Sequence, residues 1–329
     1  MDIYEPPFKI TNRIIGYVGS ISEKVGCCNT CRNIETKPHL RRNNRIKSVH
    51  SSLKIEANSL SEGSVRAVLD NRLVIGPQKE IQEVKNAFAA YELLPDTDPY
   101  SVDELKKLHG VMTYLTVEES GEFRKGAEGV FDGERCIFMA PPPEMVPELM
   151  CGLFAWMSKN RNIIHPLILS SVFHYEFVFI HPFGDGNGRM ARLWQTLLLS
   201  SWEPVFRYIP IESQIEKFQN EYYAAIARCS AAGDSTAFIE FMLARIDEVL
   251  AEVLRGSAAD EDLTPYTKKL LSVMEYDTAY SANELLGLLG LSSKEALRRN
   301  YIAPALSYGL IEMTVPDKPT SRNQRYRKK

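Results

Sequence analysis

One short bend in the sequence brings together residue types that could act on a phosphate group. Within the run HPFGDGNGR, residues 181–189, three glycines alternate with Asp185 and Asn187, and His181 ends the apolar segment that precedes them. Glycine lets the backbone approach a ligand closely and adopt conformations that other residues avoid. Because the bend leads into a helical pattern, the free amide N–H groups of the helix start and the helix dipole would attract an anion.

Charged side chains around the bend complete this pattern. Arg189 and Arg192 are three positions apart, so both can face one ligand from the expected helix, and the planar guanidinium fork suits phosphate oxygens. Asp185 offers the hard oxygen atom that Mg²⁺ prefers where it bridges phosphates. His181 can accept a proton near neutral pH, since the ordinary pKa of histidine is about 6.5. These groups indicate phosphoryl-type transfer from a nucleotide, whereas the absence of a GxxxxGK[ST] run excludes a P-loop.

The segments that must position the bend are mostly helical in pattern. Apolar residues recur with helical spacing in residues 11–26, 44–61, 79–94, 101–115, 166–180 and 189–201, and in about 144–157, 211–229 and 235–254. Thr11 and Ser101 stand where a helix would begin, and Gly26 where the first helix would end. We therefore predict a mainly α-helical fold.

Residues 129–143 break the helical pattern. The run GVFDGERCIFMAPPP has two strand-like stretches around Asp132 and Gly133, a dipeptide favoured in tight hairpins, and ends in three prolines. An exposed strand edge of this kind can pair with an extended segment of another protein. A hairpin that only covers the core is an equally good interpretation.

The C-terminal fifth of the chain has its own pattern. Residues 255–265 are small, polar and acidic, which indicates a linker. Two capping-box spacings and a helix stop follow, at Ser281 with Glu284, Ser292 with Glu295, and Gly290. With the strand-like stretches 310–315 and 324–327, residues 266–329 predict a winged helix-turn-helix domain.

Composition sets broad limits. The chain has 329 residues, a net charge of −3 and 44% hydrophobic residues, so bulk charge does not favour nucleic-acid or membrane binding. It contains no apolar run long enough for a transmembrane helix, and its N-terminus, with early acids and prolines, lacks a signal-peptide pattern. Six cysteines fit a reducing cytoplasm. Cys28 and Cys31 have zinc-site spacing, but without a second pair free thiols are the favoured interpretation.

Residues 181–192 resemble the HPFx[D/E]GNGRxxR motif of the Fic (Fido) family at every fixed position. The resemblance implies a Fic helical core over residues 47–254, with a β-hairpin flap and a preceding helical region over residues 1–46. It also implies a protein adenylyltransferase that moves AMP from Mg²⁺-bound ATP onto a Tyr, Thr or Ser hydroxyl of an unidentified target protein and releases pyrophosphate. Self-modification and a homodimer are compatible with the same resemblance.

The resemblance assigns a role to each motif residue. His181 would take the proton from the target hydroxyl, and Asp185 would hold Mg²⁺ against the α- and β-phosphates. Asn187 and the backbone of its two glycine neighbours would form the anion hole. Arg189 would hold the β- and γ-phosphates and Arg192 the γ-phosphate, while Phe183 would anchor the bend in the core. The nucleotide-binding set is Phe183, Gly184, Asp185, Gly186, Asn187, Gly188, Arg189 and Arg192.

A second resemblance lies upstream. The run SSLKIEAN resembles the inhibitory motif [S/T]xxxE[G/N] of the same family, with Ser52 and Glu56 at the required spacing. This implies an inhibitory helix near residues 47–60 whose Glu56 pairs with Arg192 and occupies the place of the γ-phosphate. The residue after Glu56 is Ala57 rather than Gly or Asn.

Two further regions have weaker assignments. The flap would dock the target through the residues Val130, Phe131, Ile137, Phe138 and Met139. In the C-terminal domain, Lys294, Arg298 and Arg299 are available to contact DNA phosphates. A protein-contact module with a solvated basic end explains the same residues.

Other functions remain alternatives at this point. A DNA-binding transcriptional regulator could use the helical core to sense a nucleotide, but a sensor needs no base at His181. Relatives that remove AMP or use another nucleotide share most phosphate-contacting residues. A toxin is a weaker alternative, since toxins of this family often rely on a separate antitoxin.

Overall fold

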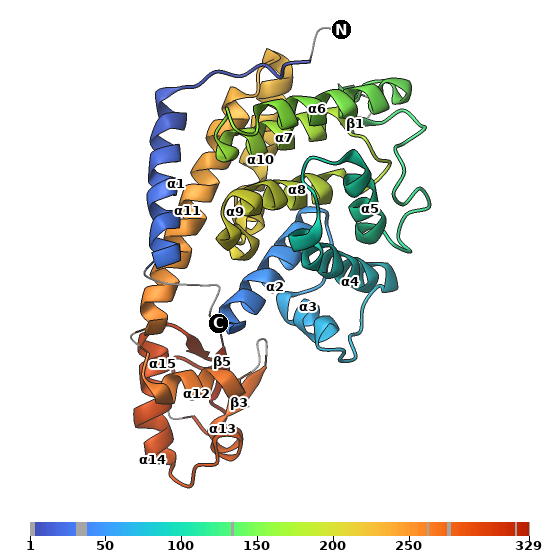
Figure 1. The fold of residues 1–329 in the computed structure, drawn as a ribbon. Helices are drawn as coiled ribbons and strands as arrows, with labels where there is room; N and C mark the ends of the chain where they lie inside the picture. The colour runs from blue at the N-terminus through green and yellow to red at the C-terminus, as the bar shows by residue number, and fades with distance from the viewer. Residues whose placement is uncertain are drawn as a thin grey trace. The chain divides into compact units, whose positions relative to one another are not determined.

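The computed structural model of the chain describes residues 4–30, 38–132, 135–261, 263–274, 278–319 and 321–328. The chain divides into two compact units, Met1–Leu254 and Arg255–Lys329 (Figure 1). In the described part of the chain, no helix is both long enough and apolar enough to cross a membrane.

The described part of the first unit consists of helices, connecting loops and a hairpin. Its elements are α1 (Asn12–Thr30), α2 (Pro38–Ile55), α3 (Glu62–Leu69), α4 (Gln78–Glu92), α5 (Val102–Met112), β1 (Gly129–Asp132), β2 (Arg135–Met139), α6 (Val146–Asn160), α7 (Pro166–Ile180), α8 (Asn187–Trp202), α9 (Ile211–Lys217), α10 (Gln219–Ala232) and the part of α11 (Thr236–Glu261) that ends at Leu254. This mainly α-helical fold is the one that the sequence predicts.

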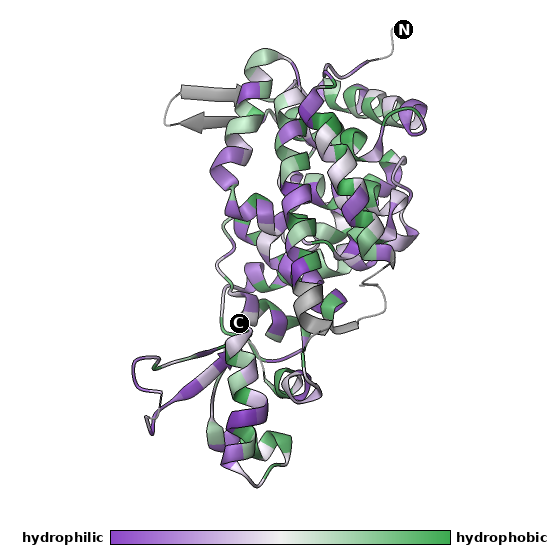
Figure 2. Ribbon diagram, turned by 90° about the vertical axis from the view of Figure 1, so that its left-hand side faces the viewer, coloured by the Kyte–Doolittle hydropathy of each residue, from purple (hydrophilic) through white to green (hydrophobic). Residues whose placement is uncertain are grey.

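Two buried helices form the centre of this unit. α7 and α8 pack along each other, and most residues of both are buried. A helix that is apolar on all sides must be enclosed by other elements; here α6 packs on α7, and α5 on α8. Trp194, Phe173 and Phe177 are fully buried in this core. Elsewhere hydrophilic and hydrophobic residues alternate along the helices, as expected for amphipathic elements (Figure 2).

Several predicted helix boundaries differ from the structure. α1 continues through Gly26 to Thr30, because Val25 and Cys28 on either side are buried in the core and outweigh the cost of a glycine inside a helix. The expected helix over residues 211–229 is broken at Phe218, whose ψ of 40° is not helical. α11 runs on to Glu261, so residues 255–261 are helical rather than an irregular linker.

The hairpin has the predicted position. β1 and β2 pair antiparallel, with Val130 opposite Phe138 and a register shift after Val130. Asp132 pairs with Arg135, and Gly133 of the expected turn lies outside the described residues.

The second unit has a small core of its own. It contains α12 (Pro265–Val273), β3 (Ala279–Ser281), α13 (Ala282–Leu289), α14 (Lys294–Ala296), a π-helical segment (Leu297–Ile302), α15 (Ala303–Ser307), β4 (Ile311–Met313) and β5 (Arg325–Lys328). The strands form an antiparallel sheet in the order β3-β5-β4. Leu285, Leu297 and Tyr326 are among the residues that form its core.

Helix signals in this unit are confirmed with one correction. The capping box of Ser281 and Glu284 is complete, and Gly290 ends α13 with a φ of 67°. The second helix is capped by Ser293, whose hydroxyl accepts a hydrogen bond from the amide of Ala296, and not by Ser292. Ser292 and Ser293 are adjacent and have the same side chain, so local pattern does not decide which of them caps the helix.

α2 ends in a left-handed turn. It begins at Pro38, before the predicted start, and its last residue is Ile55. The amides of Ala57 and Asn58 donate to the carbonyls of Lys54 and Leu53, which is the hydrogen-bond pattern of a Schellman motif. Ala57 has a φ of 64°, a conformation that glycine adopts freely but that costs another L-residue roughly 1 kcal/mol. Glu56 is therefore the residue that caps the C-terminus of α2.

Because glycine relieves this strain, Ala57→Gly should raise the free energy of unfolding by about 1 kcal/mol. The same chemical change inside a regular helix, Ala67→Gly in α3, should instead lower it by about 0.5–1 kcal/mol. Urea unfolding monitored by circular dichroism measures both effects. A destabilised Ala57→Gly variant would contradict the left-handed turn at residue 57.

Candidate functional site

The bend of residues 181–186 joins the two central helices. His181 ends α7 in a left-handed conformation with a φ of 53°, and its amide donates to the carbonyl of Phe177. Gly186 caps the start of α8 with a φ of 83°. A Cβ atom on Gly186 would lie 3.1 Å from Thr113 Cγ2 and 3.4 Å from His109 Nε2. Both the backbone angle and the close approach therefore require glycine at position 186.

Phe183 and Asn187 fasten the bend from inside. Phe183 is fully buried and its ring stacks on that of His109, with 3.6 Å between the ring centroids. The Asn187 side chain donates to the Phe183 carbonyl at 2.6 Å and accepts from the Phe183 amide at 3.0 Å. Oδ1 and one N–H of the Asn187 amide hold the bend in this way, and a contribution of Asn187 to the anion hole stays a prediction.

His109 is a site residue that the sequence analysis missed. Its Nδ1 accepts a hydrogen bond from the Gly121 amide at 2.9 Å, so in the neutral ring Nε2 carries the proton and donates to the Asp185 carbonyl at 3.0 Å. Burial lowers the pKa of His109 to about 4, and the ring is neutral at neutral pH. A lone histidine among the buried positions Leu105, Leu108 and Met112 of α5 was the only available signal.

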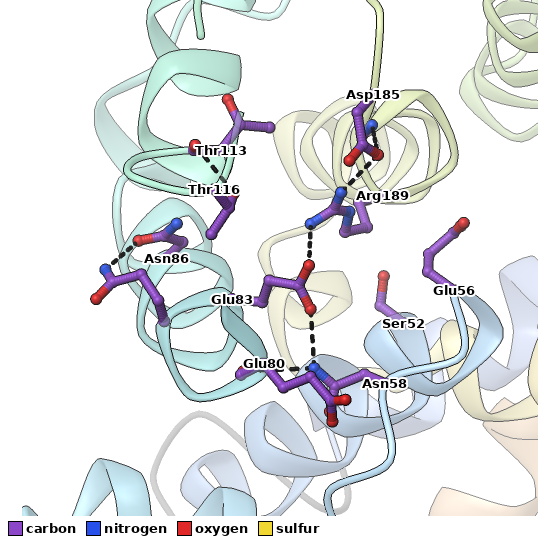
Figure 3. Close-up of polar contacts among 12 residues, drawn as sticks. Ser52, Glu56, Asn58, Glu80, Glu83, Asn86, Thr113, Thr116, Asp185 and Arg189 are labelled. Atoms are coloured by element: carbon purple, nitrogen blue, oxygen red, sulfur yellow. Dashed lines mark hydrogen bonds and ion pairs between the residues drawn. The ribbon is translucent and has the colours of Figure 1, made fainter. Parts of the chain in front are cut away.

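Arg189 is buried and only partly satisfied. Its Nη2 lies 2.9 Å from Asp185 Oδ1, and its Nη1 lies 3.6 Å from Glu83 Oε1 of α4 (Figure 3). Within the described residues, neither Nε nor Nη1 has a hydrogen-bond acceptor. Buried charged donors that lack an acceptor are costly, so this side chain favours an anionic ligand.

Arg192 is buried and makes several polar contacts. Its Nε donates to Ser52 Oγ at 3.1 Å, and its Nη2 donates to the Ser52 carbonyl at 2.9 Å. The same nitrogen pairs with Glu56 Oε1 at 2.7 Å. Burial alone would lower the pKa of Arg192, but the charge of Glu56 and the neighbouring hydroxyl of Tyr222 raise it overall.

The Glu56 carboxylate lies at the N-terminal end of α8. A Cβ atom on Gly188 would lie only 2.3 Å from Glu56 Oε1, so only a residue without a side chain leaves room for this carboxylate. The first amides of α8 have no partners within the helix, and the helix dipole attracts negative charge there. Glu56 therefore lies at the helix start where the sequence predicts an anion site, and it reaches this position from the end of α2 (Figure 3).

A chain of contacts links the α2 turn to the bend. Asn58 Nδ2 donates to Glu83 Oε2 at 2.9 Å and to the Glu80 carbonyl at 3.3 Å. Glu83 in turn faces Arg189, which pairs with Asp185 (Figure 3). The turn that carries Glu56 is thus connected to the metal-ligand candidate Asp185 through α4.

His181 has the protonation state that a base needs. Its Nδ1 lies 3.3 Å from the Val178 carbonyl, which can only accept, so the proton of the neutral ring sits on Nδ1 and Nε2 is left as the acceptor. The pKa of His181 is lowered, mainly by burial and further by Arg124, against opposing effects of the Val178 carbonyl, Glu128 and Glu56.

Two groups of expected residues are described only in part. In the flap, Met139 is exposed, while the side chains of Val130, Phe131, Ile137 and Phe138 lie outside the described residues. Cys28 is buried and Cys31 lies outside the described residues.

Comparison with known proteins identifies two matching families and several relatives. The Fic/DOC family matches residues 99–199, and the family described as "Filamentation induced by cAMP protein Fic-like, C-terminal domain" matches residues 265–328. Two curated relatives are the protein adenylyltransferase fic-1 of Caenorhabditis elegans, 31% identical over 59% of this chain, and the protein adenylyltransferase Fic of Nematostella vectensis, 28% identical over 60%. The chain spans only 38% and 46% of the lengths of these two relatives.

A solved structure covers almost the whole chain. A Fic family protein from Desulfovibrio desulfuricans G20 is 41% identical, and the two superpose with a TM-score of 0.74 over 99% of this chain and 98% of the other. With sequence and fold alike over this length, the chain belongs to the Fic family.

Proposed function

We propose that the protein transfers AMP from ATP onto a hydroxyl side chain of a target protein, and that the conformation described above is its inhibited state. The observation that carries the proposal is the Glu56 carboxylate, which pairs with Arg192 and lies against Gly188 at the start of α8. A carboxylate oxygen in this position resembles a phosphate oxygen in charge and size. The names of the two curated relatives support the same activity.

The chemistry follows from the groups around the bend. His181 Nε2 takes the proton of the target hydroxyl, and the hydroxyl oxygen forms a bond to the α-phosphorus of ATP. The bond between that phosphorus and the bridging oxygen breaks, and pyrophosphate leaves with the electron pair. Arg189 and the first amides of α8 stabilise the negative charge that develops on the phosphate oxygens. The lowered pKa of His181 keeps its imidazole neutral, as proton abstraction requires.

Asp185 fits the magnesium ion that ATP chemistry uses. Its carboxylate is 46% exposed and engages Arg189 and the Gly186 amide through Oδ1 alone among the described contacts. Mg²⁺ is commonly held by one or two carboxylates together with substrate phosphates, so one available carboxylate oxygen suffices. Bound there, the ion would neutralise charge on the phosphates. The described residues contain no cluster of three or more ligands that would hold a metal without a nucleotide.

Inhibition is a competition between two anions for Arg192. The guanidinium group is buried, and a buried cation needs a counter-charge. Glu56 supplies it when nucleotide is absent. The γ-phosphate would need the same place, so ATP must either displace Glu56 or bind in an unproductive position.

The C-terminal unit has no assigned role in this chemistry. Lys294, Arg298 and Arg299 are exposed, which suits a contact with DNA phosphates. Two arginines of β5 are instead close to acids, Arg325 to Glu284 and Arg327 to Glu312. A winged helix that contacts either DNA or protein therefore stays a prediction.

Removing the Glu56 carboxylate should increase the rate of AMP transfer. The variant Glu56→Gly loses an ion pair of about 1.5–3 kcal/mol, so auto-modification measured with labelled ATP should rise roughly 10- to 100-fold. Glu92→Gly, the same change at the last residue of α4, is the matched control and should leave the rate unchanged. An unchanged rate in Glu56→Gly would refute the inhibitory role.

Removing the base should abolish transfer without abolishing binding. In the Glu56→Gly background, His181→Ala should lower the rate by about 10²- to 10⁴-fold, while calorimetry shows the same affinity for ATP. His165→Ala, at the opposite end of α7, is the control and should retain the rate. If transfer persists without His181, another group is the base.

A further inference from the structure

Arg124 is a buried arginine outside the Fic motif that holds the end of α7. The residue is 3% exposed. Nε donates to the His181 carbonyl at 2.6 Å, and Nη2 lies 3.4 Å from the Ile180 carbonyl. The last carbonyls of a helix lack partners within the helix and carry the negative end of its dipole. Arg124 therefore satisfies the end of the helix at the residue that supplies the candidate base.

The same guanidinium group also holds both ends of the flap. Nη1 donates to the Gly126 carbonyl at 2.7 Å, before β1, and Nη2 donates to the Pro141 carbonyl at 2.5 Å, after β2. The Arg124 amide donates to the Pro182 carbonyl at 2.9 Å. The Arg124 side chain thus joins three segments: the loop that leads into the hairpin, the loop that leaves it, and the backbone of His181.

Only arginine can make this junction. The contacts reach four carbonyl oxygens on three segments, and they need several donors in a fixed plane. Lysine would retain the positive charge, but its single ammonium group cannot reach all of these oxygens. The two functions of Arg124, charge and bridging, can therefore be separated by substitution.

We propose that Arg124 is a positioning residue that fixes the root of the flap to the backbone of His181, so that a target segment paired with the flap brings its hydroxyl to the imidazole. The proposal rests on the transferase function proposed above. A shift of about 1 Å between reacting groups can cost as much as 100-fold in rate, so a loose junction would impair transfer while ATP binds normally.

The charge of Arg124 gives the proposal a second, independent readout. The charged groups that act on His181 are Arg124, which lowers its pKa, and Glu128 and Glu56, which raise it. In a Glu56→Gly background, Arg124 and Glu128 remain. A cation disfavours the imidazolium form, so removal of the Arg124 charge should raise the pKa of His181. The acidic limb of the pH–rate profile, over which the transfer rate falls as the pH is lowered, should then move to higher pH.

The experiment compares Arg124→Lys and Arg124→Met in the Glu56→Gly background. Auto-modification with labelled ATP is followed from pH 5 to 9, and ATP affinity and melting temperature are measured for each variant. Arg124→Lys should lower the rate about 10- to 100-fold without moving the acidic limb. Arg124→Met should lower the rate similarly and move the limb upwards. Both should bind ATP as the parent does.

The neighbouring residue provides a matched control. Lys125 is exposed and pairs with Glu122 on the surface. Lys125→Met therefore removes the same charge one residue away and should change neither the auto-modification rate nor the position of the acidic limb. The proposal would be overturned if both Arg124 variants had the auto-modification rate and the acidic limb of the Glu56→Gly parent. A loss of rate that parallels a loss of ATP binding would overturn it as well. If Arg124→Met does not fold, Arg124→Lys decides the bridging role.

Failure of this inference can be told from failure of the proposed function. If Glu56→Gly transfers nothing, the transferase function fails, whereas the junction can still be tested without activity. NMR titration of His181, assigned by comparison with His181→Ala, should show a raised pKa in Arg124→Met, and amide exchange should be faster in residues 126–141. Unchanged titration and exchange would overturn the junction itself.

Discussion

The site is organised around the positive charge of Arg192. An ion at this depth requires a partner of opposite sign, since an unpaired buried charge costs several kcal/mol. Ser52 and Tyr222 only offer hydrogen bonds, and among the described residues Glu56 supplies the negative charge that directly contacts it. The start of α8 lies beside the same carboxylate and adds its own attraction for anions. This requirement explains both the reach of Glu56 from the end of α2 and the absence of a side chain at Gly188.

The two faces of the bend have different tasks. On the inner face, Phe183, His109 and Asn187 use their ring stacking and hydrogen bonds to hold the backbone in place. On the outer face, Arg189 still lacks hydrogen-bond acceptors for two of its nitrogens within the described residues. A rigid backbone on one side and unsatisfied donors on the other are what a preorganised anion site needs. Under the proposed function, the bend accepts a phosphate without rearranging the contacts that support it.

The sequence predicted elements that depend on local pattern. α7 was predicted over the residues that the structure gives, because its apolar run begins at Pro166 and ends where glycines follow. The bend and its charged residues were found because a fixed spacing carries them. Contacts between distant segments left no such signal: Arg124 and His181 are 57 residues apart, and His109 and Asp185 are 76 apart. Phe218 interrupts a helix without glycine or proline, so local pattern could not reveal that break either.

The left-handed turn at Ala57 affects how strongly Glu56 competes with nucleotide under the proposed function. Glu56 behaves as an intramolecular ligand, and its effective concentration at the anion site depends on how often the end of α2 is formed. Because alanine is strained at the positive φ of residue 57, the end of α2 opens more often than it would with glycine there. Under the proposed function, nucleotide and Glu56 weaken each other's binding by the same factor. Ala57 would thus influence the nucleotide concentration at which the end of α2 opens and Glu56 leaves Arg192.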